Sequence, residues 1–202
     1  MKLILKMFKY LSLGTVICVG GIVLWLVLIQ IESQAAMREW SRLGGGVGVQ
    51  SNARFGPAQM MIGTMPGRKT ETDMKAIKAA ALRLNRWPGC RGLSIGDLDW
   101  SCEEIKELMD PLRLDHFHIQ GIALDEEFIN YLANRPDLDS IAIGRGWDRK
   151  RHAIAPAFSA EAVRRLLQNS PKRTLSTGGI AFVPEEKAKL LEEFAGRLTI
   201  WK

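Results

Sequence analysis

Residues 63–70, which read GTMPGRKT, come close to the phosphate-binding loop G-x-x-x-x-G-K-[ST]. They lie between an apolar run and a helix-like run, as such loops do. However, three residues instead of four separate the glycines, and Arg68 separates the second glycine from the lysine. Pro66 also lacks the backbone N–H that would point at a phosphate. We interpret the segment as a strand-to-helix loop in which Thr70 or Thr72 caps the helix, and keep a nucleotide- or phosphate-binding or enzymatic domain built on residues 63–70 as the alternative.

A second glycine cluster, residues 44–48, reads GGGVG and invites comparison with a dinucleotide-binding turn. That turn links a strand to a helix, whereas this cluster follows a helix-like run over residues 32–43. The glycines are better explained as the end of that helix and the start of an edge strand.

His116 and His118 are two residues apart, so on a strand they lie on the same face. A metal site needs at least one further ligand, and only Asp97 or Asp115 could be invoked nearby. Solvated histidines on a polar face are the simpler interpretation. The sequence therefore predicts no metal site, and His118 remains a candidate contact for a partner.

Residues 144–152, which read GRGWDRKRH, are dense in positive charge and carry one tryptophan. Arginine and tryptophan dominate the energetics of many interfaces, and loops often carry function. The alternative is a solvated loop whose tryptophan packs against neighbouring residues. An envelope protein or an anionic surface would suit the charge of this loop. The residues that we expect to contact a partner are Arg145, Trp147, Arg149, Lys150, Arg151 and His118.

Catalytic and cofactor-binding patterns are otherwise missing from the sequence. No Ser/His/Asp arrangement follows from the spacing, and no Cys/His cluster has zinc-site spacing. The paired acids at residues 103–104 and 126–127 are explained by their place at helix starts, where they oppose the helix dipole. We therefore expect a non-catalytic protein with no cofactor.

The composition indicates a folded protein with a modest excess of positive charge. Of 202 residues, 47% are hydrophobic and 25% are charged, which excludes a disordered chain. The net charge is +6, and three of these charges are lysines that precede Leu11. The remaining charge of about +3 (6 − 3) is too small and too dispersed to predict nucleic-acid binding.

The stretch from Leu11 to Ile31 contains no charged residue. As a helix, 21 residues rise roughly 31 Å, enough to cross a hydrocarbon core of ~30 Å. Three basic residues precede the stretch and two, Arg38 and Arg42, follow it, which places the amino terminus in the cytoplasm and the main domain outside. Cleavage after Ala35 is the alternative, although the apolar run exceeds the length typical of signal peptides.

The body of the chain repeats at a step of 24 residues (114 − 90 and 138 − 114). The aligned apolar triplets are Cys90/Leu93/Ile95, Leu114/Phe117/Ile119 and Leu138/Ile141/Ile143. Each triplet predicts a short strand with alternate residues facing a core, followed by a helix. Ser101 and Asp125 are expected N-caps of the helices, and Pro111 and Pro136 follow their ends.

Less regular units extend the pattern in both directions. The further strands are expected at residues 60–62, 175–177 and 198–200, and the further helices at residues 73–84, 160–168 and 185–194. Steps of 33 (93 − 60) and 34 (175 − 141) residues indicate insertions near residues 63–72 and 145–158. The middle residues of successive strands, Ser94, His118, Ala142 and Ser176, should line one exposed, concave face.

The cysteines are expected to be free. Cys90 takes an apolar position of the repeat, and Cys102 lies in the first turn of the following helix. The strand between them separates its ends by roughly 15 Å, which is too far for a disulfide.

An uncleaved anchor, a short helix ending in Leu43-Gly44-Gly45, and strand–helix units of about 24 residues resemble bacterial membrane-anchored leucine-rich-repeat proteins. The asparagine ladder of many such repeats is replaced by Leu98, Ile122 and Gly146. The resemblance therefore implies a short, irregular α/β solenoid instead of a regular horseshoe. It also implies a binding or scaffolding role at the cell envelope and supplies no catalytic residue.

The expected organisation has four parts. A basic cytoplasmic tail occupies residues 1–10, a transmembrane helix 11–31, a juxtamembrane helix and capping segment 32–57, and a leucine-rich-repeat-like domain 58–202.

Overall fold

The computed structural model describes residues 2–48, 59–63, 74–86, 89–96, 100–122, 124–144, 146–147, 153–154, 159–178 and 182–201. The elements, in chain order, are α1 (Lys2–Arg42), β1 (Gly45–Gly48), β2 (Gln59–Gly63), α2 (Met74–Asn85), β3 (Gly92–Gly96), α3 (Cys102–Met109), β4 (His116–Gln120), α4 (Glu126–Ala133), β5 (Ser140–Gly144), β6 (Gly146–Trp147), β7 (Ala153–Ile154), α5 (Ala160–Gln168), β8 (Thr174–Gly178), α6 (Pro184–Glu193) and β9 (Leu198–Trp201).

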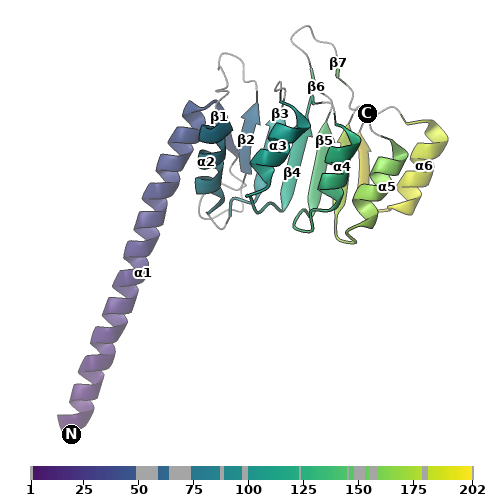
Figure 1. The fold of residues 1–202 in the computed structure, drawn as a ribbon. Helices are drawn as coiled ribbons and strands as arrows, with labels where there is room; N and C mark the ends of the chain where they lie inside the picture. The colour runs from purple at the N-terminus through teal and green to yellow at the C-terminus, as the bar shows by residue number, and fades with distance from the viewer. Residues whose placement is uncertain are drawn as a thin grey trace.

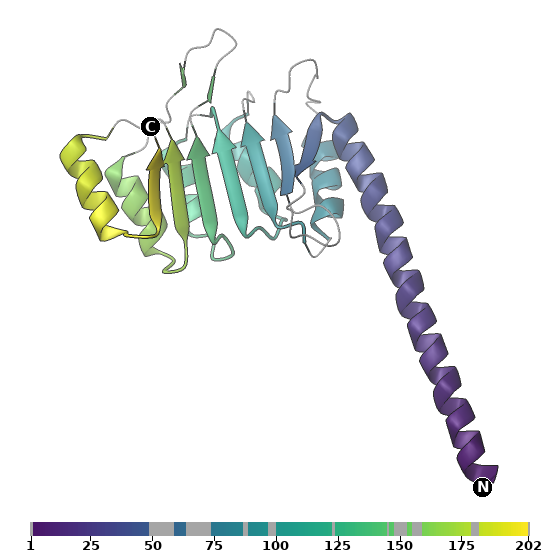
Figure 2. The ribbon, with the colours of Figure 1, turned by 180° about the vertical axis from the view of Figure 1, so that it is seen from behind.

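Seven strands form one sheet whose order, β1-β2-β3-β4-β5-β8-β9, follows the chain. The six strands from β2 to β9 run parallel and alternate with helices, while β1 runs antiparallel along the edge. Helices α2 to α6 all cover the same face of the sheet (Figure 1), and no helix of the described residues covers the opposite face (Figure 2). The predicted class, α/β with strand–helix units, is confirmed, and every strand predicted from the repeat is present.

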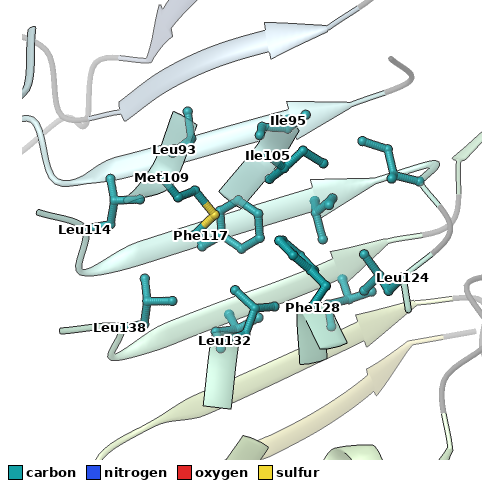
Figure 3. Packing of buried hydrophobic residues seen from close by; sticks show 14 of the residues in the cluster. Leu93, Ile95, Ile105, Met109, Leu114, Phe117, Leu124, Phe128, Leu132 and Leu138 are labelled. Carbon is teal, nitrogen blue, oxygen red and sulfur yellow. The ribbon is translucent and has the colours of Figure 1, made fainter. Parts of the chain in front are cut away.

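The hydrophobic core lies between the sheet and the helices, as Figure 3 shows. Neighbouring strands pair in register, so the first inward residues of the repeat form a row across the sheet. The residues of this row are Leu93, Phe117, Ile141 and Leu175, all at most 1% exposed. The ring of Phe117 meets that of Phe128 from α4 edge-on at 6.2 Å between centroids. Each such buried side chain contributes ~1.5–3 kcal/mol of burial free energy.

Local capping interactions start the middle helices where the sequence predicts. The Ser101 side chain accepts from the Glu104 N–H, and the Glu104 carboxylate accepts from the Ser101 N–H, which completes a capping box. The Asp125 carboxylate accepts from the Phe128 N–H at 2.6 Å. Both predicted N-caps are confirmed. Cys90 and Cys102 are buried and form no disulfide, also as predicted.

Arginine side chains bind the backbone carbonyls where the helices end. Arg135 donates to the carbonyls of Met109 and Leu112, at 3.0 and 2.8 Å. Arg173, which is fully buried, donates to carbonyls at the carboxyl ends of two neighbouring helices, those of Ala133 and Leu166. Because the last carbonyls of a helix lack partners within the helix, these cations satisfy them and also oppose the helix dipole.

Arg197 extends this arrangement to the last strand–helix unit. It donates to the carbonyls of Arg173 and Ser170, at 3.1 and 2.7 Å, and to that of Leu167. The three arginines thus join successive units through backbone contacts. These contacts were not predicted from the sequence.

Helix α1 runs without a break from Lys2 to Arg42, so the predicted transmembrane and juxtamembrane helices are one element. Its last turns belong to the folded domain: Ala36, Trp40 and Leu43 are at most 1% exposed. The Trp40 indole Nε1 donates to the Met61 carbonyl of β2 at 3.0 Å. Earlier turns expose large apolar side chains, and among the described residues α1 is the one helix long and apolar enough to span a membrane.

The chain leaves α1 through a glycine turn that confirms the predicted helix end and edge strand. Gly44 has φ of 89°, a left-handed conformation that favours glycine. At Gly45, a Cβ atom would lie only 2.2 Å from the Trp40 Nε1. The buried indole therefore requires glycine at the first residue of β1.

Candidate interaction surface

The face of the sheet opposite the helices, here called the open face, carries the outward residues of every strand. Its central row is Ser94, His118, Ala142 and Ser176, which pair in register on β3, β4, β5 and β8. All four are partly exposed. The prediction that these residues share one exposed face is confirmed, because alternate residues of a strand point to opposite faces.

His118 is held in place across this row. Its Nδ1 lies 3.0 Å from the Ser94 Oγ, and its Nε2 lies beside Gly144 on the opposite neighbouring strand. Burial lowers the pKa of His118 below its ordinary value, which favours the neutral ring that shares a hydrogen bond with the Ser94 hydroxyl. His116, two residues earlier, is exposed on the same face.

The Ser94–His118 pair differs from the arrangement of a serine nucleophile. In a catalytic triad the second nitrogen of the histidine binds a carboxylate, which fixes the ring and stabilises its charged form. Here that nitrogen faces Gly144. Within the described part of the chain, no group of three His, Cys, Asp or Glu side chains could hold a metal ion.

Near the carboxyl ends of the strands, glycines leave the open face with few projecting side chains. Gly63, Gly96 and Gly144 share one row with Gln120, which lies against the last two of them. At the sheet edge, Trp201 of β9 pairs with Gly178 of β8, and its ring would lie 3.6 Å from a Cβ there. Trp201 remains 56% exposed and is the large aromatic group of this surface.

The sequence analysis did not single out Trp201. The outward position of Trp201 could have been inferred from the alternation of the last predicted strand. Leu198 and Ile200 face the core, so Trp201 faces outward. An exposed tryptophan at this position is a stronger candidate contact than His118, which lies three strands away on β4, because tryptophan is enriched among residues that dominate binding energy.

A two-stranded hairpin rises from the carboxyl end of β5, next to the glycine row. Its strands β6 and β7 pair antiparallel, Gly146 with Ile154 and Trp147 with Ala153, and the hairpin projects beyond the sheet in both ribbon views (Figures 1 and 2). Trp147 therefore lies at the base of the hairpin. The predicted contacts Arg145, Arg149, Lys150 and Arg151 lie outside the described residues.

Among the described residues, the topology gives the carboxyl edge of the sheet no crevice of the usual kind. Ligands of open α/β sheets bind where the strand order reverses and neighbouring loops diverge to opposite faces. The order here never reverses, and the helices lie on one face. Gly63 ends β2 at this edge, as predicted, and the rest of the segment GTMPGRKT lies outside the described residues.

The helical face presents paired charges instead. Ion pairs connect neighbouring helices along the layer: Lys78–Glu107, Lys106–Glu127, Arg165–Glu126 and Arg164–Glu193, at 2.5 to 3.3 Å. Exposed pairs of this kind contribute only about 0–1 kcal/mol each. They nevertheless connect each helix of the layer to its neighbour, so much of the charge on the helical face is paired within the domain.

Comparison of the chain with models of known families, with curated proteins and with solved structures returned no match.

Proposed function

We propose that this protein is a membrane-anchored, non-catalytic module that binds another protein of the cell envelope through its open face and the adjoining hairpin. The observation that carries the proposal is the helix-free sheet face, with Trp201, His118 and the hairpin base gathered around a row of glycines. Contact surfaces need accessible aromatic groups surrounded by polar residues, and this face supplies both.

The architecture supports a short, irregular leucine-rich-repeat-like solenoid. Each strand–helix unit packs beside the next in chain order, and the arginine–carbonyl contacts connect successive units. In such an array each unit stabilises its neighbours and leaves an extended surface for binding.

The anchor in this proposal is α1, with residues 11–31 crossing the membrane, the amino terminus in the cytoplasm and the domain outside. The exposed apolar side chains of its earlier turns support insertion, since exposed apolar surface of this extent is costly in water. The excess of basic residues before the stretch supports the orientation.

Site-specific photo-crosslinking in native membranes tests the proposed surface. A photoreactive residue at His116 or Trp201 is expected to capture a discrete partner, whereas one at Gln168 on the helical face serves as the matched control. Capture from Gln168 alone, or equal capture from all three positions, would remove the open face from consideration.

Nucleotide or phosphate binding around residues 63–70 remains the second candidate, carried by the position of Gly63 at the carboxyl edge of a parallel strand. Thermal unfolding of the purified full chain with nucleotide and Mg²⁺ separates the candidates. Saturable stabilisation would favour nucleotide binding, since a ligand that binds the folded state raises its melting temperature.

A further inference from the structure

A hollow of about 210 Å³ lies between α1 and α2. Its lining residues are Ile29, Glu32 and Ser33 from α1 and Arg83 and Arg86 from α2. The volume is below the ~300–1,000 Å³ of pockets that enclose drug-sized ligands, so the hollow suits a small group.

The hollow lies at the boundary between the apolar and the charged parts of α1. Ile29 belongs to the uncharged stretch of residues 11–31, and Glu32 is the first charged residue after it. Figure 1 shows α2 beside the domain end of α1, with the carboxyl end of α2 directed toward the apolar part. With α1 anchored as proposed above, on which this inference rests, the hollow opens at the level of the lipid headgroups.

The charges around the hollow are of two kinds. Arg83 is bound to Glu39 at 2.6 Å, which fixes α2 against α1. Arg86 and Glu32 are only loosely paired at 3.6 Å, and their side chains are 76% and 52% exposed. The hollow therefore offers one accessible cation and one accessible anion side by side, with no net charge.

We propose that this hollow binds the headgroup of a phospholipid that carries both a phosphate and a primary ammonium group. The Arg86 guanidinium donates to the phosphate oxygens, and the Glu32 carboxylate accepts from the ammonium. Ile29 packs against the start of the acyl chains. A purely anionic headgroup would bind Arg86 but would be repelled by the Glu32 carboxylate. A quaternary ammonium headgroup has no N–H group to donate to Glu32.

Native mass spectrometry of the full-length chain in detergent, with equal amounts of phosphatidylethanolamine, phosphatidylglycerol and phosphatidylcholine, tests the proposal. We expect phosphatidylethanolamine to be retained in preference to both others. Glu32→Gln should lower its preference over phosphatidylglycerol about two- to fivefold, the effect of one exposed ion pair. Arg86→Gln should weaken retention of phosphatidylethanolamine and of phosphatidylglycerol. Arg113→Gln is the matched control, because Arg113 is an exposed arginine on the turn after α3.

Equal retention of the three lipids, or the same loss in Arg113→Gln as in Arg86→Gln, would overturn the headgroup site. Carbonate extraction of native membranes tests the anchor separately. A chain that stays in the membrane but shows no lipid preference contradicts only the headgroup site, while release by carbonate contradicts the anchor and the site together. Soluble phosphoethanolamine should compete weakly, because it lacks the acyl contact with Ile29; strong competition would instead assign the hollow to a soluble ligand.

Discussion

The two ends of the seven-stranded sheet are completed in different ways. At the β1 end, α1 closes the core with Trp40 and Leu43, which are at most 1% exposed. At the β9 end, the last strand and α6 expose large apolar groups; outside α1, those that the described residues expose are Val183, Leu191 and Trp201. An array of stacked units needs a polar or covered surface at each end. The first end is covered by α1, whereas the β9 end combines the charged residues of α6 with these exposed apolar groups.

This difference indicates that α1 has a structural role in the folded domain besides the membrane anchoring that we propose for it. Its final turns act as the cap of the sheet, because they supply the apolar surface that a preceding strand–helix unit would have supplied. The β9 end relies instead on arginines that bind backbone carbonyls, with Arg173 and Arg197 reaching across the last units. The predictions below compare the closed end with the open one.

The largest expected effect is at the closed end. Trp40→Ala should cost about 3–5 kcal/mol of unfolding free energy, since it empties a buried site and removes the bond to the Met61 carbonyl. Trp201→Ala, at the open end, should cost less than about 1 kcal/mol. The melting temperatures of both full-length variants in detergent check this comparison, and similar losses would show that the two ends do not differ.

Arg173→Met should destabilise the open end by about 3 kcal/mol, because several buried carbonyls lose a charged donor while the apolar stem is largely kept. Lys172→Met changes an exposed neighbour and is the control. Denaturant titration measures both. A loss in Arg173→Met no greater than that of the control would mean that water replaces the arginine without cost.

Gly45→Ala should cost about 1–3 kcal/mol, because the added methyl group would displace the buried Trp40 ring. Gly20→Ala, in a helical position with open space around it, should cost nothing and slightly favour the helix. Thermal unfolding of the pair tests whether the closed end is packed as tightly as described.

Thr177→Val should stabilise the open end by about 1 kcal/mol. Thr177 takes an inward position where β3, β4 and β5 carry isoleucine, and its Oγ1 is buried without a hydrogen-bond partner among the described residues. Replacing an unsatisfied hydroxyl by a methyl group removes its desolvation cost. Thr199→Val on exposed β9 should have little effect, and a loss of stability in Thr177→Val would refute this assignment.

The smallest expected effect on stability comes from the titration of His118, in the middle of the sheet. Because burial lowers its folded-state pKa, the unfolded chain binds a proton first as pH falls below about 6.5, and stability decreases through that window. His118→Gln should remove this part of the slope, by less than about 1 kcal/mol. Melting temperatures at pH 7.5 and pH 5 measure it; an unchanged slope in the variant would contradict the assigned cause.

The repeat in the sequence predicted much of the fold. An apolar residue at every second strand position, with Ser101 and Asp125 before the helices, was enough to locate strands, helices and the open face. These features depend on local spacing, which a sequence displays directly. The 24-residue step also placed Ser94 beside His118 before any distance was known.

Other features depend on contacts that spacing does not reveal. The arginine–carbonyl contacts join Arg173 to residues as distant as Ala133. Every residue has a backbone carbonyl, so the type of the accepting residue does not indicate such a contact. The docking of α1 likewise depends on the hydrogen bond from the Trp40 indole to a β2 carbonyl, which residue spacing does not reveal. The buried residues of α1 follow directly on the long apolar stretch, so their apolar character did not distinguish them as contacts of the domain. The candidate surface was only partly foreseen, because Trp201 was not recognised as its aromatic group.

The direction of α1 has a consequence for self-association. Figures 1 and 2 show α1 running broadly along the strands β2 to β9, with the same sense. Two copies that joined their β9 edges as antiparallel neighbours would be related by a two-fold axis perpendicular to the sheet, so their α1 helices would point in opposite directions. With α1 inserted as proposed, two molecules of the same orientation in one membrane cannot adopt this arrangement, so the proposed anchor would exclude antiparallel pairing of two β9 edges.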